Sequence, residues 1–195
     1  MRHARTPSNA EARLQGRIDP ALDDVGVEQA RVAGEAIRGR WTIDRVVTTS
    51  RRRARATIDR AGFRDLPVVV DDRWSEIDFG DHDNRRISEV TKELGAAWAS
   101  DVDYTPPNGE SIAAMHGRVG QALADVAEAA RDETILVVTH ANPVKSAVAW
   151  LLGSGVESLL RMRVDLASIT AFTPGRDSLL MTDYNWCPAR DAGPG

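Results

Sequence analysis

The hydrophobic positions of this chain follow two alternating patterns, helical spacing and short β-branched runs. Between Asp23 and Gly39, apolar side chains recur at roughly helical spacing, at Val27, Ala30, Val32, Ala33 and Ile37. Residues 43–49 are apolar and β-branched, which predicts a buried strand. The same criteria predict helices at residues 51–61, 87–99, 111–130 and 143–152, and strands at residues 68–70, 134–139, 168–172 and 178–181. This alternation predicts an α/β fold, a three-layer αβα sandwich with a mostly parallel central sheet.

The composition fits one globular domain without a strong charge. The 195 residues are 42% hydrophobic and 28% charged, and the net charge of -4 gives no general attraction for nucleic acid or for an anionic membrane. Cys187 is the single cysteine, and neither a leader nor a long apolar run is apparent. We therefore expect a cytoplasmic protein without nucleic-acid or membrane partners; its oligomeric state is open, a homodimer included. Residues 1–187 would form the domain and residues 188–195 a disordered tail.

Polar residues at the predicted strand ends suggest a phosphate site. Thr49 and His140 end two strands at the edge where such sheets bind ligands, and Arg53 lies one helical turn beyond Thr49. Arginine presents a planar fork of donors to phosphate oxygens, so Arg2 and Arg53 could neutralise a phosphate dianion.

Two further residues could carry the chemistry of phosphate transfer. A neutral imidazole can attack phosphorus and form a phosphoramidate, and His3 fits that role. The leaving alkoxide needs a proton, which a carboxylic acid of raised pKa could supply before activating water, and Glu76 fits that role.

Five segments resemble the signatures of the histidine phosphatase superfamily, the phosphoglycerate mutase-like proteins. They are residues 2–9 (RHARTPSN) with 13–16 (RLQG), 48–57 (TTSRRRARAT), 74–80 (WSEIDFG), 108–111 (NGES) and 137–140 (VVTH). The resemblance implies that His3 is phosphorylated, that Glu76 donates the proton, and that Arg2, Arg53 and His140 clamp the phosphate. It also implies substrate contacts from Asn9, Gln15, Gly16 and Ala141. No metal or cofactor is implied. The compact segment between Arg53 and Glu76 and the short lid region after it, at about 77–115, are more similar to the family's phosphatases than to its larger mutases.

The chain departs from the family pattern at several positions. Alanine replaces the usual glycine at Ala4 and Ala141, which adds a methyl group where the backbone would approach phosphate. Arg5 adds positive charge that could favour a substrate with a second anionic group. Residues 81–84 (DHDN) differ from the residues that follow the acid-donor segment in the family, so the lid would contact its substrate through different side chains. Only Met1 precedes Arg2, where the family has an apolar strand; either the true start lies upstream or the sheet tolerates the loss.

Other interpretations of these residues stay open at this point. The runner-up function is a mutase of the same chemistry, and the third is a catalytically weak phosphate-binding regulatory protein. Residues 51–55 could form a basic nucleic-acid patch, and Asp78, Asp81, His82 and Asp83 could collect a divalent ion, although they lack a known ligand spacing. Further candidates for the lid region are Arg85, Arg86, Trp98, Tyr104 and His116. The substrate, a small phosphorylated metabolite, is not identified by the sequence.

Overall fold

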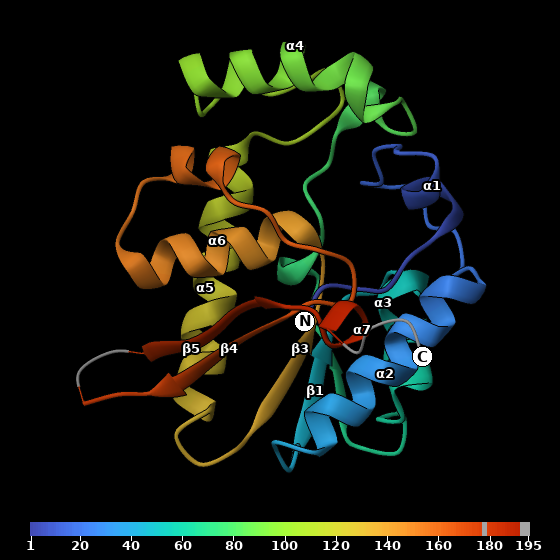
Figure 1. The fold of residues 1–195 in the computed structure, drawn as a ribbon. Coiled ribbons are helices and arrows are strands. Elements are labelled where there is room, and N and C mark those ends of the chain that lie inside the picture. The colour runs from blue at the N-terminus through green and yellow to red at the C-terminus, as the bar shows by residue number, and fades with distance from the viewer. Residues whose placement is uncertain (177–178, 192–195) are drawn as a thin grey trace.

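The computed structural model describes residues 1–176 and 179–191 of the chain. Helices and strands alternate as the hydrophobic pattern predicts (Figure 1). The helices are α1 (Pro7–Ala10), α2 (Asp24–Arg38), α3 (Arg52–Ala61), η1 (Asp72–Trp74), η2 (Gly80–His82), α4 (Ile87–Ser100), α5 (Ile112–Ala129), α6 (Ala141–Leu152), η3 (Val156–Arg161) and α7 (Pro188–Asp191). The strands are β1 (Arg45–Thr48), β2 (Val68–Val70), β3 (Ile135–Val138), β4 (Ile169–Pro174) and β5 (Leu179–Trp186).

A parallel sheet with the strand order β2-β1-β3 forms the centre of the molecule. Thr48 of β1 lies opposite Val70 of β2 and Val138 of β3, so the carboxyl ends of the three strands are level. The two final strands, β4 and β5, form a separate antiparallel pair and do not extend the parallel sheet. The first residue of the segment predicted at 178–181 falls outside the described part of the chain.

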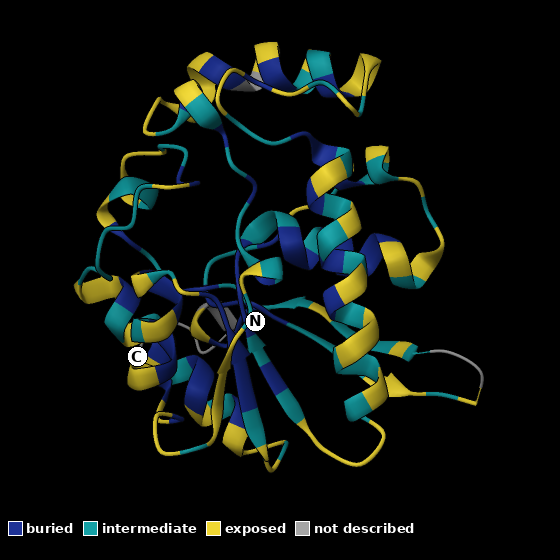
Figure 2. Ribbon diagram, turned by 180° about the vertical axis from the view of Figure 1, so that it is seen from behind, coloured by how far each residue is buried: buried dark blue, intermediate teal, exposed yellow. Residues whose placement is uncertain are grey.

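Helices cover both faces of the parallel sheet, which confirms the three-layer αβα architecture. Successive strand residues point to opposite faces. Val46 and Val138 pack in one core with α2 and α3, whereas Val47 packs in a second core with Met115 of α5 and Ala147 of α6. Figure 2 shows buried positions along the central strands and exposed positions on the outer sides of the helices.

The ends of the two helices on the first face follow from local chemistry. The carboxylate of Asp23 accepts a hydrogen bond from the amide of Gly26 at 2.8 Å, which caps α2. Helix α3 ends at Gly62, whose φ of 79° lies in the left-handed region that favours glycine. These caps fix where each helix begins or ends relative to the strand beside it.

The first three residues extend the sheet by a short segment beside β3. Arg2 forms a parallel bridge with Thr139, and the Met1 ammonium donates to the carbonyl of Val137 at 2.8 Å. On the other side, the amide of Arg2 donates to the carbonyl of Ser168 at 3.0 Å. The segment 1–3 is therefore held between β3 and the chain that leads into β4.

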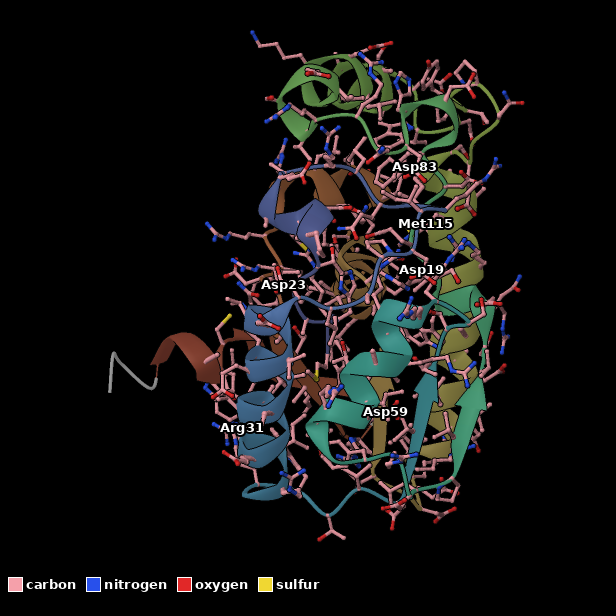
Figure 3. All side chains as sticks on the ribbon, turned by 90° about the vertical axis from the view of Figure 1, so that its right-hand side faces the viewer. Asp19, Asp23, Arg31, Asp59, Asp83 and Met115 are labelled. Atoms are coloured by element: carbon pink, nitrogen blue, oxygen red, sulfur yellow. The ribbon has the colours of Figure 1, made fainter. Side chains whose placement is uncertain are left out.

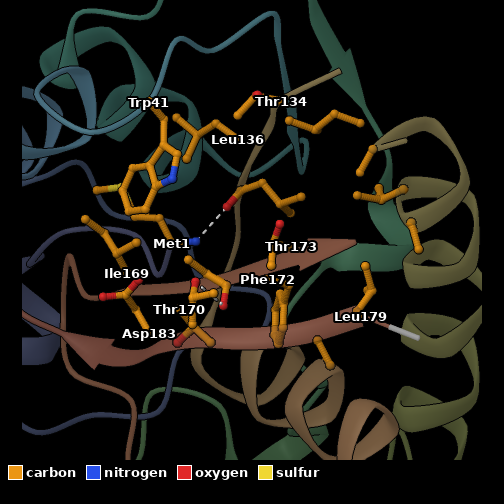
Figure 4. Close-up of a pocket in the computed structure, with 18 of the residues that line it drawn as sticks. Met1, Trp41, Thr134, Leu136, Ile169, Thr170, Phe172, Thr173, Leu179 and Asp183 are labelled. Carbon is orange, nitrogen blue, oxygen red and sulfur yellow. Dashed lines mark hydrogen bonds between the residues drawn. The ribbon is translucent and has the colours of Figure 1, made fainter. Parts of the chain in front are cut away.

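A cavity of about 510 Å³ lies below this segment, between β3 and β4 (Figure 4). Its lining is largely apolar and includes Met1, Trp41, Val137, Ile169 and Phe172. The family resemblance leads us to expect a strand ahead of Arg2, beside β3. In the structure Met1 lies at one end of that position and lines the cavity. The described residues form all three layers although none of them occupies this position in the sheet.

The C-terminal segment differs in part from its prediction. Residues Pro188–Asp191, predicted as a disordered tail, form the short helix α7, which packs near α2. The prediction of a disordered tail therefore includes four residues that are helical in the structure, and residues 192–195 lie outside the described part. None of the helices in the described part combines the length and apolar character needed to cross a membrane.

Candidate active site

The predicted site residues meet at the carboxyl ends of the parallel strands. His3 follows the segment beside β3, His140 follows β3 itself, and Arg53 lies on α3 just beyond β1. The rings of His3 and His140 are 5.3 Å apart between centroids, at an angle of 61°. The three residues are buried, although they come from distant parts of the sequence.

The ring of His3 is oriented by its own backbone. Its Nδ1 lies 2.8 Å from the carbonyl oxygen of Ala4. Because a carbonyl oxygen can only accept, Nδ1 carries the proton, and Nε2 of the neutral ring keeps its lone pair. Burial, followed by the positive charges of Arg53 and Arg2, lowers the pKa of His3 well below its usual range. This environment favours a neutral imidazole.

His140 occupies the N-terminus of α6. Its Nε2 lies 3.0 Å from the hydroxyl of Thr49, and its buried Nδ1 has no hydrogen-bond partner among the described residues. Burial and the nearby Arg53 lower the pKa of His140 well below its usual range. The unpaired Nδ1 is a polar group that an incoming ligand could satisfy.

Arg53 is fully buried and held by one loop. Its guanidinium donates to the carbonyls of Ile18 and Gln15 at 2.8 and 2.9 Å and pairs with the carboxylate of Asp19 at 3.2 Å. Asp19 also accepts from the amides of Arg52 and Arg53, which caps the start of α3. Figure 3 shows Asp19 beside the upper end of α3. The Nε of Arg53 is buried without a described partner, so a donor remains for phosphate oxygen.

Glu76 and Arg2 complete the charged part of the site. The carboxylate of Glu76 accepts from the amides of Ile77, Ala141 and Asn142 at 3.0, 3.2 and 3.3 Å, so the start of α6 holds it. One terminal nitrogen of Arg2 donates to the carbonyl of Val164 at 2.7 Å, while its buried Nε has no described partner.

A cavity of about 310 Å³ opens at this point. Its lining brings together Arg2, His3, Asn9, Arg13, Leu14, Gln15, Glu76, Phe79, Ile87, Ala141, Asn142, Lys145, Met162, Arg163 and Val164. Arg53 and His140 are fully buried and are not among the residues that line the cavity. The cavity is smaller and more polar in character than the apolar one beside Met1, and it contains the predicted nucleophile and acid.

The remaining predicted residues have more limited contacts. Asn9 and Gln15 line the cavity, and both side-chain oxygens accept from the hydroxyl of Thr6, at 3.0 and 2.8 Å. Gly16 does not line it; a Cβ there would lie 2.9 Å from the carbonyl oxygen of Ile77, so glycine allows close packing of two backbone segments. Ala141 lines the cavity, and its backbone amide donates to the carboxylate of Glu76.

Ala4, the other alanine in place of a family glycine, lies outside the cavity lining. It is fully buried, and its amide donates to the hydroxyl of Thr57 at 3.1 Å. Its methyl group therefore packs in the core between the site and α3.

The expectation for Arg5 was wrong. Its Nε pairs with the carboxylate of Asp23 at 2.9 Å, and it does not line the cavity. The sequence did not indicate this ion pair, because Asp23 directly precedes α2 and its carboxylate is already accounted for as the N-cap of that helix. The additional cations that do line the cavity are Arg13, Lys145 and Arg163.

The acidic residues of 78–83 are engaged in local contacts. Asp83 accepts from the amides of Gly16 and Ile18 at 2.6 and 2.8 Å, and Asp78 pairs with Arg17 at 2.7 Å. Within residues 1–176 and 179–191, no group of three or more potential ligands is arranged to hold a metal ion. The cluster therefore ties the first loop to the lid.

The other candidates of the lid region lie outside the cavity lining. Trp98 is buried and donates to the carbonyl of Tyr104 at 3.1 Å, and the ring of His116 stacks on Trp150 with centroids 4.9 Å apart. Arg85 approaches the Nδ1 of His82 at 2.9 Å. Helix α4 lies across the top of the molecule in Figure 1, and only its first residue, Ile87, reaches the cavity.

Sequence reasoning missed several residues that contact Glu76 or line the cavity, among them Arg118 and Lys145. Arg118 of α5 donates to the carbonyls of Ser75 and Glu76 at 2.7 and 3.2 Å and pairs with Glu110 at 2.7 Å, which fixes the backbone of the predicted acid. Lys145 lines the cavity from α6. Its position one helical turn after Ala141 was the available signal, because residues four apart share a helix face.

Comparison with known proteins places the chain in a family. Residues 1–187 match the histidine phosphatase superfamily (branch 1). The glucosyl-3-phosphoglycerate phosphatase of Mycolicibacterium vanbaalenii is 33% identical over 170 residues, covering 81% of this chain and 75% of the relative. Phosphoserine phosphatase 1 of Hydrogenobacter thermophilus is 28% identical over 175 residues, covering 86% and 82%.

The fold comparison agrees with the sequence comparison. The structure of the alpha-ribazole phosphatase from Shigella flexneri matches with a TM-score of 0.82 at 27% identity, covering 95% of this chain and 94% of that one. The chain spans about half the length (48%) of the mycobacterial relatives that it matches at 33% identity over 174 residues.

Proposed function

Because this chain belongs to the histidine phosphatase superfamily, we propose that it hydrolyses a small phosphomonoester through a phosphohistidine on His3. The observation that carries the proposal is the orientation of His3: its Nδ1–H donates to the Ala4 carbonyl, and the ring lines the same cavity as Glu76 and Arg2. A neutral imidazole with one nitrogen fixed is prepared to attack with the other.

The first step transfers the phosphoryl group to the protein. Arg2, which lines the cavity, would bind the dianion through its unpartnered Nε. Arg53 is buried outside the cavity lining, so its unpartnered Nε would add to this clamp only if the phosphate binds deeper than the lining residues. Nε2 of His3 attacks phosphorus, the ester P–O bond breaks, and protonated Glu76 gives its proton to the leaving alkoxide. The buried, cationic surroundings stabilise the charge that develops on the phosphoryl oxygens.

The second step returns the protein to its starting state. Glu76, now a carboxylate, accepts a proton from a water molecule that attacks the phosphohistidine in line. The P–N bond breaks, His3 leaves as a neutral imidazole, and inorganic phosphate dissociates. The amides of Ala141 and Asn142, which point at Glu76, support its carboxylate form in this step.

The relatives give a chemical direction for the substrate. Phosphoserine and glucosyl-3-phosphoglycerate, named for two of them, each carry a carboxylate near the phosphate, whereas alpha-ribazole phosphate does not. A phosphorylated small acid is therefore the first class to test.

The test is phosphate release from a panel of phosphorylated metabolites with a chelator present. We expect release by the protein and its loss in His3→Ala, with quenching of a labelled phosphate ester in alkaline detergent, which preserves the acid-labile P–N bond, trapping labelled phosphate on His3 but not in that variant. His116→Gln, a histidine outside the cavity lining, is the control that should retain release. Full activity of His3→Ala would refute the nucleophile, isomerised product without phosphate would indicate a mutase, and binding without turnover would indicate a regulatory protein.

A further inference from the structure

Lys145 is a cation of the cavity that lies outside the phosphate clamp. It is on α6, four residues after Ala141, so both side chains project from the same helix face. It lines the cavity of about 310 Å³ together with His3 and Glu76. Only one other lysine, Lys92, occurs in the chain, and that residue is exposed on α4.

The positive charge of Lys145 is not matched by a close partner. Its side chain makes no hydrogen bond and no ion pair within 4 Å among the described residues, although it is largely withdrawn from water. Burial lowers its pKa, and the charge of Glu76 acts in the opposite direction. A cation that has lost part of its hydration, with no opposite charge within 4 Å and only the more distant charge of Glu76 to stabilise it, carries an energetic cost, which an anionic ligand would offset.

The other cations at the cavity already have partners. Arg13 pairs with Glu11 at 2.7 Å and donates to the carbonyl of Asn84 at 2.8 Å. Arg163 pairs with Asp165 at 2.6 Å and is largely exposed. Lys145 therefore stands apart from these arginines in the described part of the site.

The position of Lys145 relative to Glu76 indicates which part of a substrate it would meet. Glu76 is held by the amides at the start of α6, and Lys145 follows one turn along that helix. In the proposed reaction Glu76 protonates the ester oxygen, so the carbon skeleton of the alcohol lies on the α6 side of the phosphate. A group carried by that skeleton would come within reach of the Lys145 ammonium.

We propose that Lys145 forms a second anion subsite that binds the carboxylate of a phosphorylated hydroxy acid or amino acid. The inference rests on the proposed function for the position of the phosphate, and it extends that function by assigning a residue to substrate selection. The compact ammonium of lysine can donate to a carboxylate from several directions, without the planar geometry that a guanidinium requires.

Two matched pairs of esters test the subsite. 3-Phosphoglycerate and glycerol 3-phosphate differ by a carboxylate in place of a hydroxymethyl group, and O-phosphoserine and phosphoethanolamine differ by one carboxylate. We expect the wild-type protein to have the higher kcat/KM for the acid of each pair. Lys145→Met should lower the ratio of the two kcat/KM values roughly tenfold, as expected for loss of one charge-assisted hydrogen bond.

Two further variants separate substrate selection from a structural role. Lys145→Arg keeps the charge and should retain most of the preference, whereas Lys92→Met, which removes the other lysine, should leave the ratio as in the wild type. Loss of general integrity lowers both kcat/KM values and leaves their ratio unchanged. An unchanged ratio in Lys145→Met would overturn the subsite, whether the two kcat/KM values stay as in the wild type or fall equally.

The outcome distinguishes failure of the subsite from failure of the proposed function. If the wild-type protein releases phosphate from no ester, the proposed function fails, and calorimetric titration with 3-phosphoglycerate and glycerol 3-phosphate then tests the subsite by binding alone. Tighter binding of the acid that is lost in Lys145→Met supports the subsite. Equal affinity of wild type and Lys145→Met for the acid refutes it.

Discussion

At the scale of single residues, the site depends on which polar atoms have partners and which do not. The Nδ1 of His3 is satisfied by a carbonyl, whereas the Nε atoms of Arg2 and Arg53 and the Nδ1 of His140 are buried without described partners. Such unpaired buried groups carry a cost in the folded protein. They converge near one cavity, so binding of a phosphate oxygen would recover part of that cost.

Glu76→Gln tests the proton transfer. The amide oxygen of glutamine can still accept from the α6 amides, but the side chain cannot donate a proton to an alkoxide as an acid does. We expect turnover of alkyl phosphates to fall roughly hundredfold or more, and that of nitrophenyl phosphate much less, because nitrophenolate leaves without a proton. Steady-state kinetics on both ester types measure this difference. Glu89→Gln, on the exposed side of α4, is the control, and equal losses on both esters would reject the acid role.

At the scale of elements, the sequence predicted the order and type of the main helices and strands because their hydrophobic periods are regular. It also predicted Arg53 and His140 as neighbours, because parallel strands end at one edge, whereas His3 was placed with them only by its chemistry and by the resemblance to the family. It did not predict that Arg5 pairs with Asp23 or that Arg118 reaches the backbone of Glu76, since such pairings depend on how separate segments pack. Periodicity carries no information about those contacts.

Arg118 is expected to act as a positioning residue for Glu76. Its guanidinium donates to the carbonyls of Arg73, Ser75 and Glu76, a combination that the three donors of lysine cannot reproduce in the same plane. Arg118→Lys should lower kcat/KM for alkyl phosphates roughly tenfold through lost hydrogen bonds, with a smaller effect on nitrophenyl phosphate. The measurement is the leaving-group dependence, repeated in the Glu76→Gln background, where the substitution should add little.

The matched control for Arg118 lies on the same side of the molecule. Arg131, just beyond the end of α5, is exposed and pairs with Glu128 at 3.2 Å, so Arg131→Lys should leave the kinetics unchanged. A purely structural role for Arg118 would lower both ester types equally and would persist in the Glu76→Gln background.

At the scale of the whole molecule, the amino group of Met1 links stability to pH. Burial lowers its pKa from 8.0 to about 5, so between these values the unfolded chain binds a proton that the folded chain does not. The free energy of unfolding should therefore fall as the pH falls from 8 to 5, by about 4 kcal/mol in total at about 1.4 kcal/mol per unit. Urea unfolding across this range measures the slope.

Acetylation of Met1 isolates this contribution. His3 and His140, whose pKa values are also lowered, act in the same direction below their usual range and are unchanged by the modification. The acetylated protein should lose the amino group's share of the slope over the whole range, and the difference is clearest near pH 7.5, where the histidines of the unfolded chain are mostly neutral. Identical slopes with and without the acetyl group would show that the amino group is hydrated in the folded protein.

The cavity beside Met1 predicts how an added segment would affect the fold. Arg2 pairs with Thr139 in parallel, so residues added before Met1 would run back along β3 into the cavity of about 510 Å³. A four-residue Val-rich extension would replace the buried amino group with a peptide amide and bury apolar side chains against Trp41 and Phe172, at roughly 1.5–3 kcal/mol for each valine that is fully buried. Its melting temperature should rise above that of the unextended chain, most strongly at pH 6.

A Gly-Ser extension of equal length is the control, because it removes the ionisable amino group without filling the cavity. It should recover only the stability that the unextended chain loses between pH 8 and pH 6. If both extensions stabilise equally, the apolar cavity contributes nothing and the deprotonation of the buried amino group accounts for the whole effect.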